Sequence, residues 1–146
     1  MNGIPQIVGI VDGSHIPIIA PNENKEDYFN RKHHYSVNLM GIVDSKQKFL
    51  YASVGYPGSI HDSRVLQLSS VYNGIENGDL LSNPIVRISG LNIKPQIIGD
   101  SAFPDRSWIL KPYSDINLTP TERQFSKKLC GIREIIEQAF GMLKSR

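Results

Sequence analysis

The stretch Pro95-Gln-Ile-Ile-Gly-Asp-Ser-Ala-Phe-Pro104 is a short apolar run that ends at Gly99 and passes directly to Asp100. A carboxylate placed just after a buried strand lies where an α/β sheet opens onto a crevice, the usual position of an active site in such folds. The same order occurs near the start of the chain, where the apolar run 6–11 ends at Asp12 and Gly13. Two buried strands that each end in an aspartate predict two carboxylates converging on one metal ion.

Length and composition indicate a single domain spanning residues 1–146. The chain is 40% hydrophobic and 21% charged, as in an ordinary soluble globular protein. No apolar run is long enough to span a membrane, so no membrane partner is expected. Cys130 is the only cysteine, which excludes a disulfide within the chain. The net charge of +2 is compatible with nucleic-acid binding, because acidic metal ligands offset basic residues in a nuclease.

Hydrophobic runs and turn residues predict an α/β fold with a mixed five-stranded sheet flanked by helices. The ribonuclease H-like fold is one fold of this class. A turn over residues 55–64 is expected to open a helix that runs to about Ser69. Another helix is expected to start at Thr119 with a capping-box Glu122, and a final helix runs from about Gly131 to the end. Short helical pieces are expected within residues 72–93. The expected strands are residues 7–18, interrupted at Asp12-Gly13, then 35–43, 49–54, 96–99 and, at a sheet edge, 108–113.

The final helix offers a third carboxylate. Its apolar residues recur every three or four positions and form one stripe: Ile132, Ile135, Ile136, Ala139, Phe140 and Leu143. At about 100° per residue, Glu134 falls opposite this stripe, whereas Glu137 falls on its flank beside Arg133 and Lys144. Because a carboxylate at the margin of the buried face can reach a metal at the sheet edge, Glu137 is the better candidate ligand. Arg133 and Lys144 are expected to meet substrate phosphates or to balance the acidic cluster.

Six stretches carry a resemblance to a known family, and they are residues 11–16, 30–32, 36–38, 58–64, 99–104 and 133–141. In this order they resemble the DDE nuclease domain of PIF/Harbinger-type transposases and their domesticated relatives. The resemblance implies a ribonuclease H-like fold and an acidic triad matching Asp12, Asp100 and Glu137, which would bind divalent metal, normally Mg²⁺, for DNA cleavage and strand transfer. It also implies work in the nucleus alongside a separate DNA-binding protein. The family's usual N-terminal helix-turn-helix region precedes the first aspartate and is not matched here.

Two further groups of residues have both a structural and a functional interpretation. Ser59-Ile-His-Asp62 fits a helix-capping pattern, and the alternative is an accessory role for Asp62 in the site, with His61 orienting a carboxylate or contacting phosphate. Arg31 and Lys32, within the basic cluster 30–34, are either a solvated loop or contacts to the DNA backbone.

These residues favour a metal-dependent DNA nuclease that uses Mg²⁺ or Mn²⁺. Hard carboxylate ligands without cysteine or paired histidines suit these ions better than zinc. Two such ions can stabilise both the attacking and the leaving oxygen of an in-line displacement. Two other classes remain open: a domesticated, inactive DNA-binding or adaptor module, and a hydrolase of small phosphate esters. DNA and a separate DNA-binding protein are the expected partners. Assembly of the chain into a homo-oligomer is also compatible with the sequence.

Overall fold

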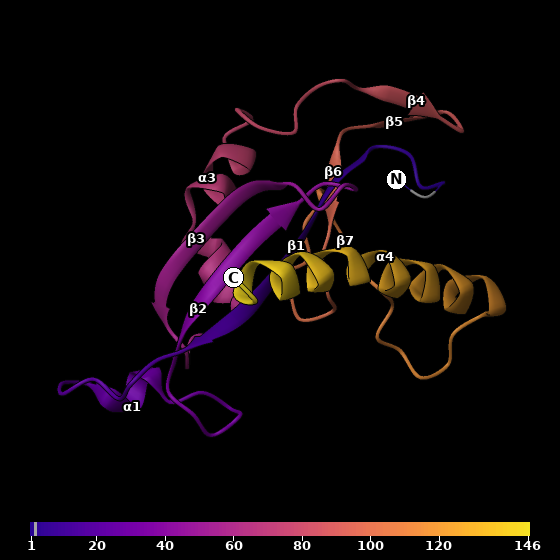
Figure 1. Ribbon diagram of the computed structural model, residues 1–146. Coiled ribbons are helices and arrows are strands. Elements are labelled where there is room, and N and C mark those ends of the chain that lie inside the picture. Colours follow the sequence, from indigo (N-terminus) through magenta and orange to yellow (C-terminus); the bar gives the residue numbers. More distant parts are fainter. Residues whose placement is uncertain (2) are drawn as a thin grey trace.

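The computed structural model describes Met1 and residues 3–146, and its elements are labelled in Figure 1. No helix in this part of the chain is both long and apolar enough to cross a membrane. The helices are α1 (Lys25–Tyr28), α2 (Asp62–Gln67), α3 (Ser70–Glu76) and α4 (Pro120–Lys144). The strands are β1 (Ile7–Pro17), β2 (Ser36–Val43), β3 (Phe49–Pro57), β4 (Val86–Ile88), β5 (Leu91–Ile93), β6 (Gln96–Ile98) and β7 (Ile109–Leu110).

In the described residues, one five-stranded sheet has the order β3-β2-β1-β6-β7, and β4 and β5 form a separate hairpin. β1, β2 and β3 pair antiparallel, while β6 runs parallel to β1, and β7 parallel to β6. The predicted mixed five-stranded sheet is therefore confirmed. Ile10 lies opposite Ile98 in the parallel pair. Asp12 and Asp100 each come two residues later, so they lie side by side just past the paired stretch of β1 and β6. The expected interruption at Asp12-Gly13 is wrong, because β1 continues through both residues to Pro17, where it pairs with β2.

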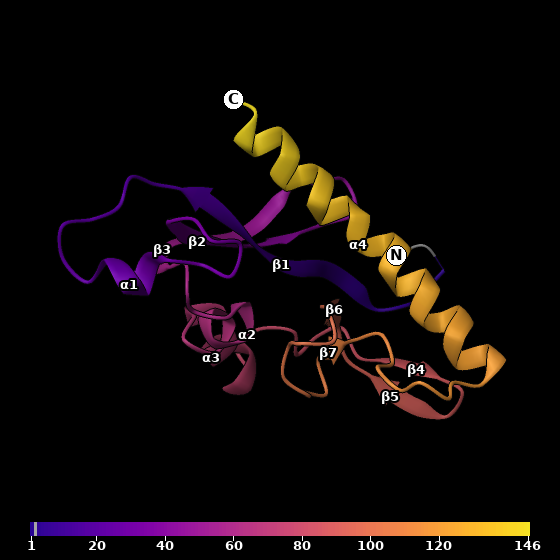
Figure 2. The same cartoon turned by 90° about the horizontal axis from the view of Figure 1, so that it is seen from below.

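Helices cover both faces of this sheet, as Figure 2 shows, with α4 on one side and α2 and α3 on the other. Below α4, the core contains Ile10, Leu39, Val43, Ile98, Leu129, Ile132, Ile136, Ala139 and Phe140. Below α2 and α3 it contains Val11, Met40, Ile42, Val65, Leu66, Ile75, Ile97, Phe103, Trp108 and Ile109. The aromatic side chains of Phe103, Trp108 and Phe140 are all buried in these two parts of the core.

The last helix is longer than the sequence predicted. It starts at Pro120 instead of near Gly131, and Thr119 forms the expected capping box with Glu122. Gly131 does not interrupt it, because a helix tolerates an isolated glycine at a cost of about 1 kcal/mol. Leu143, expected in the buried stripe, is 46% exposed, because the last turn of α4 lies beyond the core that ends at Phe140.

The segment between α2 and β6 differs most from expectation. Short helical structure is present as α3, which ends at Glu76, but the β4–β5 hairpin was not predicted. Only Ile109 and Leu110 of the expected strand 108–113 pair with β6, at the sheet edge as predicted. The hairpin residues are largely exposed and lack a buried alternating face, so the sequence contains no strong period-2 signal there.

Candidate functional site

Asp12 and Asp100 point toward α4 from neighbouring strands. Side chains alternate between the faces of a strand, and Ile10 and Ile98 belong to the core below α4, so residues two positions later face the same side. One guanidinium nitrogen of Arg133, on α4, lies 3.5 Å from Asp12 Oδ2 and 3.8 Å from Asp100 Oδ2. The predicted convergence of the two aspartates is therefore present, with a positively charged group between them.

Burial sets the electrostatics of Asp12. Desolvation raises the pKa of its carboxyl from 3.8 to about 6, and the charges of Asp62 and Asp100 act in the same direction. A hydrogen bond from the Gly13 N–H at 2.8 Å and the charge of Arg133 lower the pKa but do not outweigh burial. Asp12 thus lies in an acidic, partly desolvated position where a cation would favour its ionised form.

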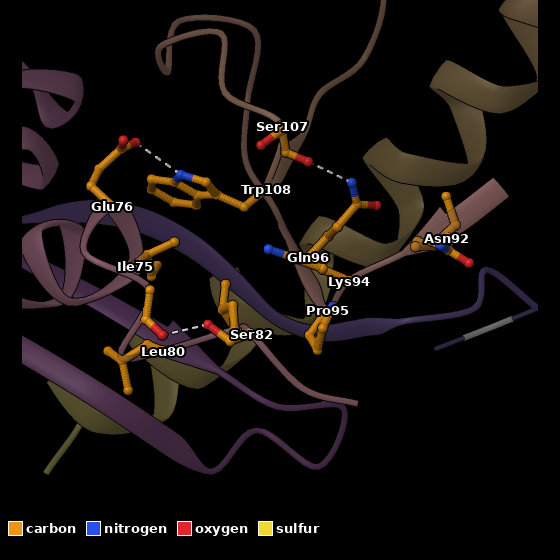
Figure 3. A pocket seen from close by; sticks show the side chains of 13 residues that line it. Ile75, Glu76, Leu80, Ser82, Asn92, Lys94, Pro95, Gln96, Ser107 and Trp108 are labelled. Carbon is orange, nitrogen blue, oxygen red and sulfur yellow. Dashed lines mark hydrogen bonds between the residues drawn. The ribbon is translucent and has the colours of Figure 1, made fainter. Parts of the chain in front are cut away.

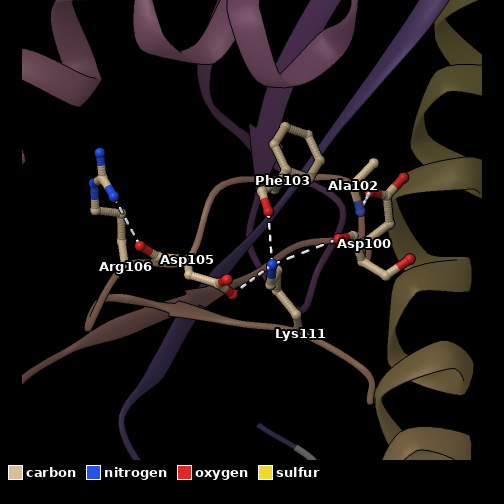
Figure 4. Close-up of polar contacts among 7 residues, drawn as sticks. Asp100, Ala102, Phe103, Asp105, Arg106 and Lys111 are labelled. Carbon is tan, nitrogen blue, oxygen red and sulfur yellow. Dashed lines mark hydrogen bonds and ion pairs between the residues drawn. The ribbon is translucent and has the colours of Figure 1, made fainter. Parts of the chain in front are cut away.

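Contacts on its buried side and on its exposed side stabilise the turn that carries Asp100. Inside, Phe103 is buried and packs so closely that a Cβ on Gly99 would lie 2.9 Å from its ring. Outside, Lys111 donates to the carbonyl of Phe103 at 2.7 Å and pairs with Asp105 at 2.7 Å, as Figure 4 shows. Asp100 Oδ1 accepts the N–H of Ala102 at 2.8 Å. These contacts leave Oδ2 as the oxygen directed toward Arg133.

Asp62 is close to Asp12, and its predicted capping role is wrong. His61 is the N-cap residue of α2, without a side-chain capping bond, and Asp62 Oδ1 instead accepts a hydrogen bond from Asn38 Nδ2 at 2.7 Å. An added Cβ on Gly13 would overlap the Asp62 carboxylate. Gly13 follows Asp12 on β1 and so faces α2, and its missing side chain leaves room for the Asp62 carboxylate on that face of the strand. The charge of Asp62 is near enough to raise the pKa of Asp12, and the accessory role of Asp62 stays a prediction.

On α4, Arg133 and Lys144 lie on one flank and both contact β1. The Lys144 ammonium donates to Ser14 Oγ at 2.7 Å and to the His15 carbonyl at 3.3 Å. Glu137 lies one turn after Arg133 on this flank but is exposed and contacts neither aspartate; Glu134 is exposed as well. Among the described residues, no three His, Cys, Asp or Glu side chains are grouped closely enough to hold a metal. The role of Glu137 as a metal ligand stays a prediction.

A basic cavity of about 170 Å³ lies next to Asp62. Arg31 and Lys32 line it together with His15, His61 and Asp62. The Arg31 guanidinium hydrogen-bonds to the His61 ring, with Nε2 at 2.9 Å. Arg31 and Lys32, predicted to contact the DNA backbone, thus share a cavity with the Asp62 carboxylate.

Sequence reasoning missed the polar residues buried behind this cavity. Asn30, Ser36 and Asn38 are at most 4% exposed, and each hydrogen-bonds to a side chain of the cavity or to one another. The signal was present in the sequence, because Ser36 and Asn38 interrupt an otherwise apolar buried strand. Buried polar groups need partners, so such interruptions indicate a network.

A larger cavity of about 420 Å³ lies at the opposite end of β6, lined by Gln96 and Trp108 (Figure 3). Its carboxylate, Glu76, accepts a hydrogen bond from Trp108 Nε1 at 3.0 Å and pairs with Arg106 at 3.3 Å. Because these partners already neutralise Glu76, this cavity offers no free carboxylate for a cation.

The donor set beside Arg133 fits a hard divalent cation. Asp12 and Asp100 supply carboxylate oxygens, the ligands that Mg²⁺ and Mn²⁺ prefer, and both already approach one positive group, the Arg133 guanidinium. Asp62 adds a third negative charge within the range that affects Asp12. Such a site, adjacent to basic side chains, suits a phosphate ester as substrate.

The chain is similar in sequence to known proteins. Residues 11–146 match the family model described as DDE superfamily endonuclease. The chain is 32% identical over 144 residues to "Putative nuclease HARBI1" of Bos taurus and 31% identical to the Homo sapiens protein of that name. It is 28% identical over 149 residues to "Protein ALP1-like" of Arabidopsis thaliana. These alignments cover 99–100% of this chain but only 37–38% of the relatives' length. No solved structure matches the chain significantly.

Proposed function

Because the chain belongs to the DDE superfamily endonucleases, we propose that it is the metal-dependent nuclease and strand-transfer domain of a Harbinger-type transposase or of a protein derived from one. The observation that carries this proposal is the convergence of Asp12 and Asp100 on a single positive group. The strand order β3-β2-β1-β6-β7, with three antiparallel strands followed by two parallel ones, supports a ribonuclease H-like fold.

Asp12 and Asp100 would hold the cation, with Glu137 as the third ligand and Asp62 as an accessory carboxylate. When bound, Mg²⁺ or Mn²⁺ supplies Lewis-acid activation of the phosphodiester and of the attacking water or 3′-hydroxyl. Arg133 lies at the site to neutralise charge on a phosphate. The backbone N–H groups of Gly13 and Ala102 orient the two aspartates by hydrogen bonds at 2.8 Å.

The substrate would be DNA, with its backbone contacted on either side of the carboxylates. Arg31 and Lys32 lie in the cavity on the α2 side, while Lys144 lies on the α4 side near Ser14. Contacts of this kind are largely independent of sequence, so a separate DNA-binding protein would provide target recognition, in the nucleus.

A second candidate function is an inactive DNA-binding or adaptor module. One observation favours it: Glu137 contacts neither aspartate in the described part of the chain, and Arg133 lies where a cation would bind. In that case the basic residues would still bind DNA, but no metal-dependent chemistry would occur.

Cleavage of a supercoiled plasmid with and without Mn²⁺ tests the nuclease proposal directly. Wild type should nick the plasmid only with Mn²⁺, and Asp100→Asn should not, whereas the matched surface variant Asp105→Asn should cleave like wild type. Calorimetric titration with Mn²⁺ separates the alternatives, because an adaptor would bind DNA without binding metal. Cleavage that persists in Asp100→Asn would refute the assigned site.

DNA binding is tested separately through its salt dependence. Replacing Arg31 and Lys32 by alanine should weaken binding to all duplexes alike and reduce the slope of log affinity against log salt by up to about two units. An unchanged slope would identify the loop as merely solvated.

A further inference from the structure

A chain of buried and partly buried hydrogen bonds connects the basic loop 30–34 to His15. The loop's own backbone begins the chain: the N–H groups of Lys32 and His34 donate to Asn30 Oδ1 at 2.9 and 3.4 Å. Two N–H donors need an acceptor, so the side-chain atom of Asn30 that faces them is the amide oxygen, and the amide nitrogen faces Ser36. It donates to Ser36 Oγ at 2.7 Å. The orientation of the Asn30 amide is therefore fixed by its partners.

The fixed orientation of the Asn30 amide determines how Ser36 can hydrogen-bond to His15. The Ser36 Oγ accepts from Asn30 and lies 2.9 Å from His15 Nδ1. Ser36 is fully buried, so an unpaired hydroxyl proton would be costly. Among the described residues, His15 Nδ1 is the acceptor that this proton can reach. The hydroxyl therefore donates to Nδ1, and the neutral imidazole carries its own proton on Nε2.

The cavity beside Asp62 is where this proton can be used. His15 lines the cavity together with Arg31, Lys32 and His61. Within the described part of the chain, Nε2 of His15 has no hydrogen-bond partner. An N–H donor without a protein acceptor, next to an arginine and a lysine, is suited to an anionic oxygen.

We propose that His15 is a further phosphate-binding residue of the DNA site, fixed by Asn30 and Ser36 as a neutral Nε2–H donor. This inference rests on the proposed function, because it takes DNA to be the ligand. It also explains why Ser36 is buried at the start of β2: its hydroxyl sets the tautomer of a ring that lines the cavity.

The surroundings of His15 favour the neutral ring. Burial lowers its pKa, and the charges of Lys32, His34 and Lys144 act in the same direction, while Asp62 opposes them. An imidazolium would also donate from Nδ1, which would leave the buried Ser36 proton without an acceptor. His15 would therefore bind phosphate as a hydrogen-bond donor without contributing a full charge.

The tautomer can be read by nitrogen NMR of the metal-free protein. A long-range ¹H–¹⁵N spectrum of the histidine rings at pH 7, assigned for His15 by its loss in His15→Gln, should show a protonated Nε2 and an unprotonated Nδ1. Ser36→Ala should shift the ring toward a mixture of tautomers. A proton on Nδ1, or on both nitrogens, would overturn the proposal without affecting the proposed nuclease function.

Binding of a fluorescent DNA duplex tests the role of the donor. Glutamine places an N–H near the Nε2 position and asparagine does not, so His15→Gln should stay within about twofold of wild type, whereas His15→Asn and His15→Ala should bind about tenfold more weakly. Equal binding by all three variants and wild type would overturn the assignment while leaving the nuclease function intact. If wild type bound no DNA, the proposed function would fail, and the phosphate role of His15 with it.

Discussion

Replacing Asp12 by asparagine should make the metal-free protein more stable at pH 8, although it removes a residue of the candidate site. Burial raises the pKa of Asp12 to about 6, so the native state holds the ionised carboxylate at a cost. Asparagine has nearly the same shape, keeps an oxygen for the Gly13 N–H, and carries no charge. Function and stability therefore oppose each other at this position.

The shift in the pKa of Asp12 determines how large the gain in stability should be and over which pH range it should appear. A rise of about two pKa units from 3.8 corresponds to roughly 3 kcal/mol in the free energy of unfolding, an upper value for the gain. Because the native state binds the proton more tightly than the unfolded state, wild type loses stability as the pH rises from about 4 to about 6. The advantage of Asp12→Asn should be absent below pH 4 and complete above pH 7.

Urea unfolding in EDTA at pH 4, 6 and 8 measures this window. Asp105→Asn is the matched control, since Lys111 lowers the pKa of the exposed Asp105 and its loss should not stabilise the protein at any of these pH values. Added Mn²⁺ should stabilise wild type but not Asp12→Asn. If Asp12→Asn were less stable than wild type at pH 8, the ion pair with Arg133 would outweigh the cost of burial, and the reasoning would be wrong.

Four other substitutions test the site and the helix that packs over the sheet. Gly13→Ala should displace the Asp62 carboxylate, reducing Mn²⁺ affinity and costing about 1–3 kcal/mol of stability in urea unfolding, as overpacking does; normal metal binding would contradict this. Glu137→Gln should abolish Mn²⁺-dependent cleavage, whereas Glu134→Gln should stay within about 0.5 kcal/mol of wild type and cleave normally; the reverse result would mean that the helix faces are misassigned. Phe140→Ala should lose about 3–5 kcal/mol, and a negligible loss would show that α4 does not hold the sheet.

Local patterns predicted the parts of the structure that local forces determine. The apolar runs before Asp12 and Asp100 became adjacent parallel strands, and the alternation of side chains then aligned both carboxylates on one face. The capping box at Thr119 correctly marked a helix start, because its two hydrogen bonds involve residues three positions apart.

Features that depend on distant partners could not be read in this way. Asp62 has the sequence context of a cap, but Asn38, 24 positions earlier, competes for its carboxylate. The β4–β5 hairpin is largely exposed, so its sequence has no alternation of apolar and polar residues that would predict a strand. Leu143 continues the apolar period of α4, yet its exposure depends on where the core below the helix ends, which the period alone does not reveal.

The continuous helix α4 has a consequence for how this chain can change in length. Arg133 and Lys144 are both tied to β1, and any residue inserted between them would turn everything downstream by about 100°. An insertion after Arg133 would rotate both Glu137 and Lys144 away from the flank of α4 that faces β1. An insertion in the loop before Thr119 would not change which residues of α4 face β1. Related chains should therefore vary in length ahead of this helix and keep the spacing from Arg133 to Lys144 constant.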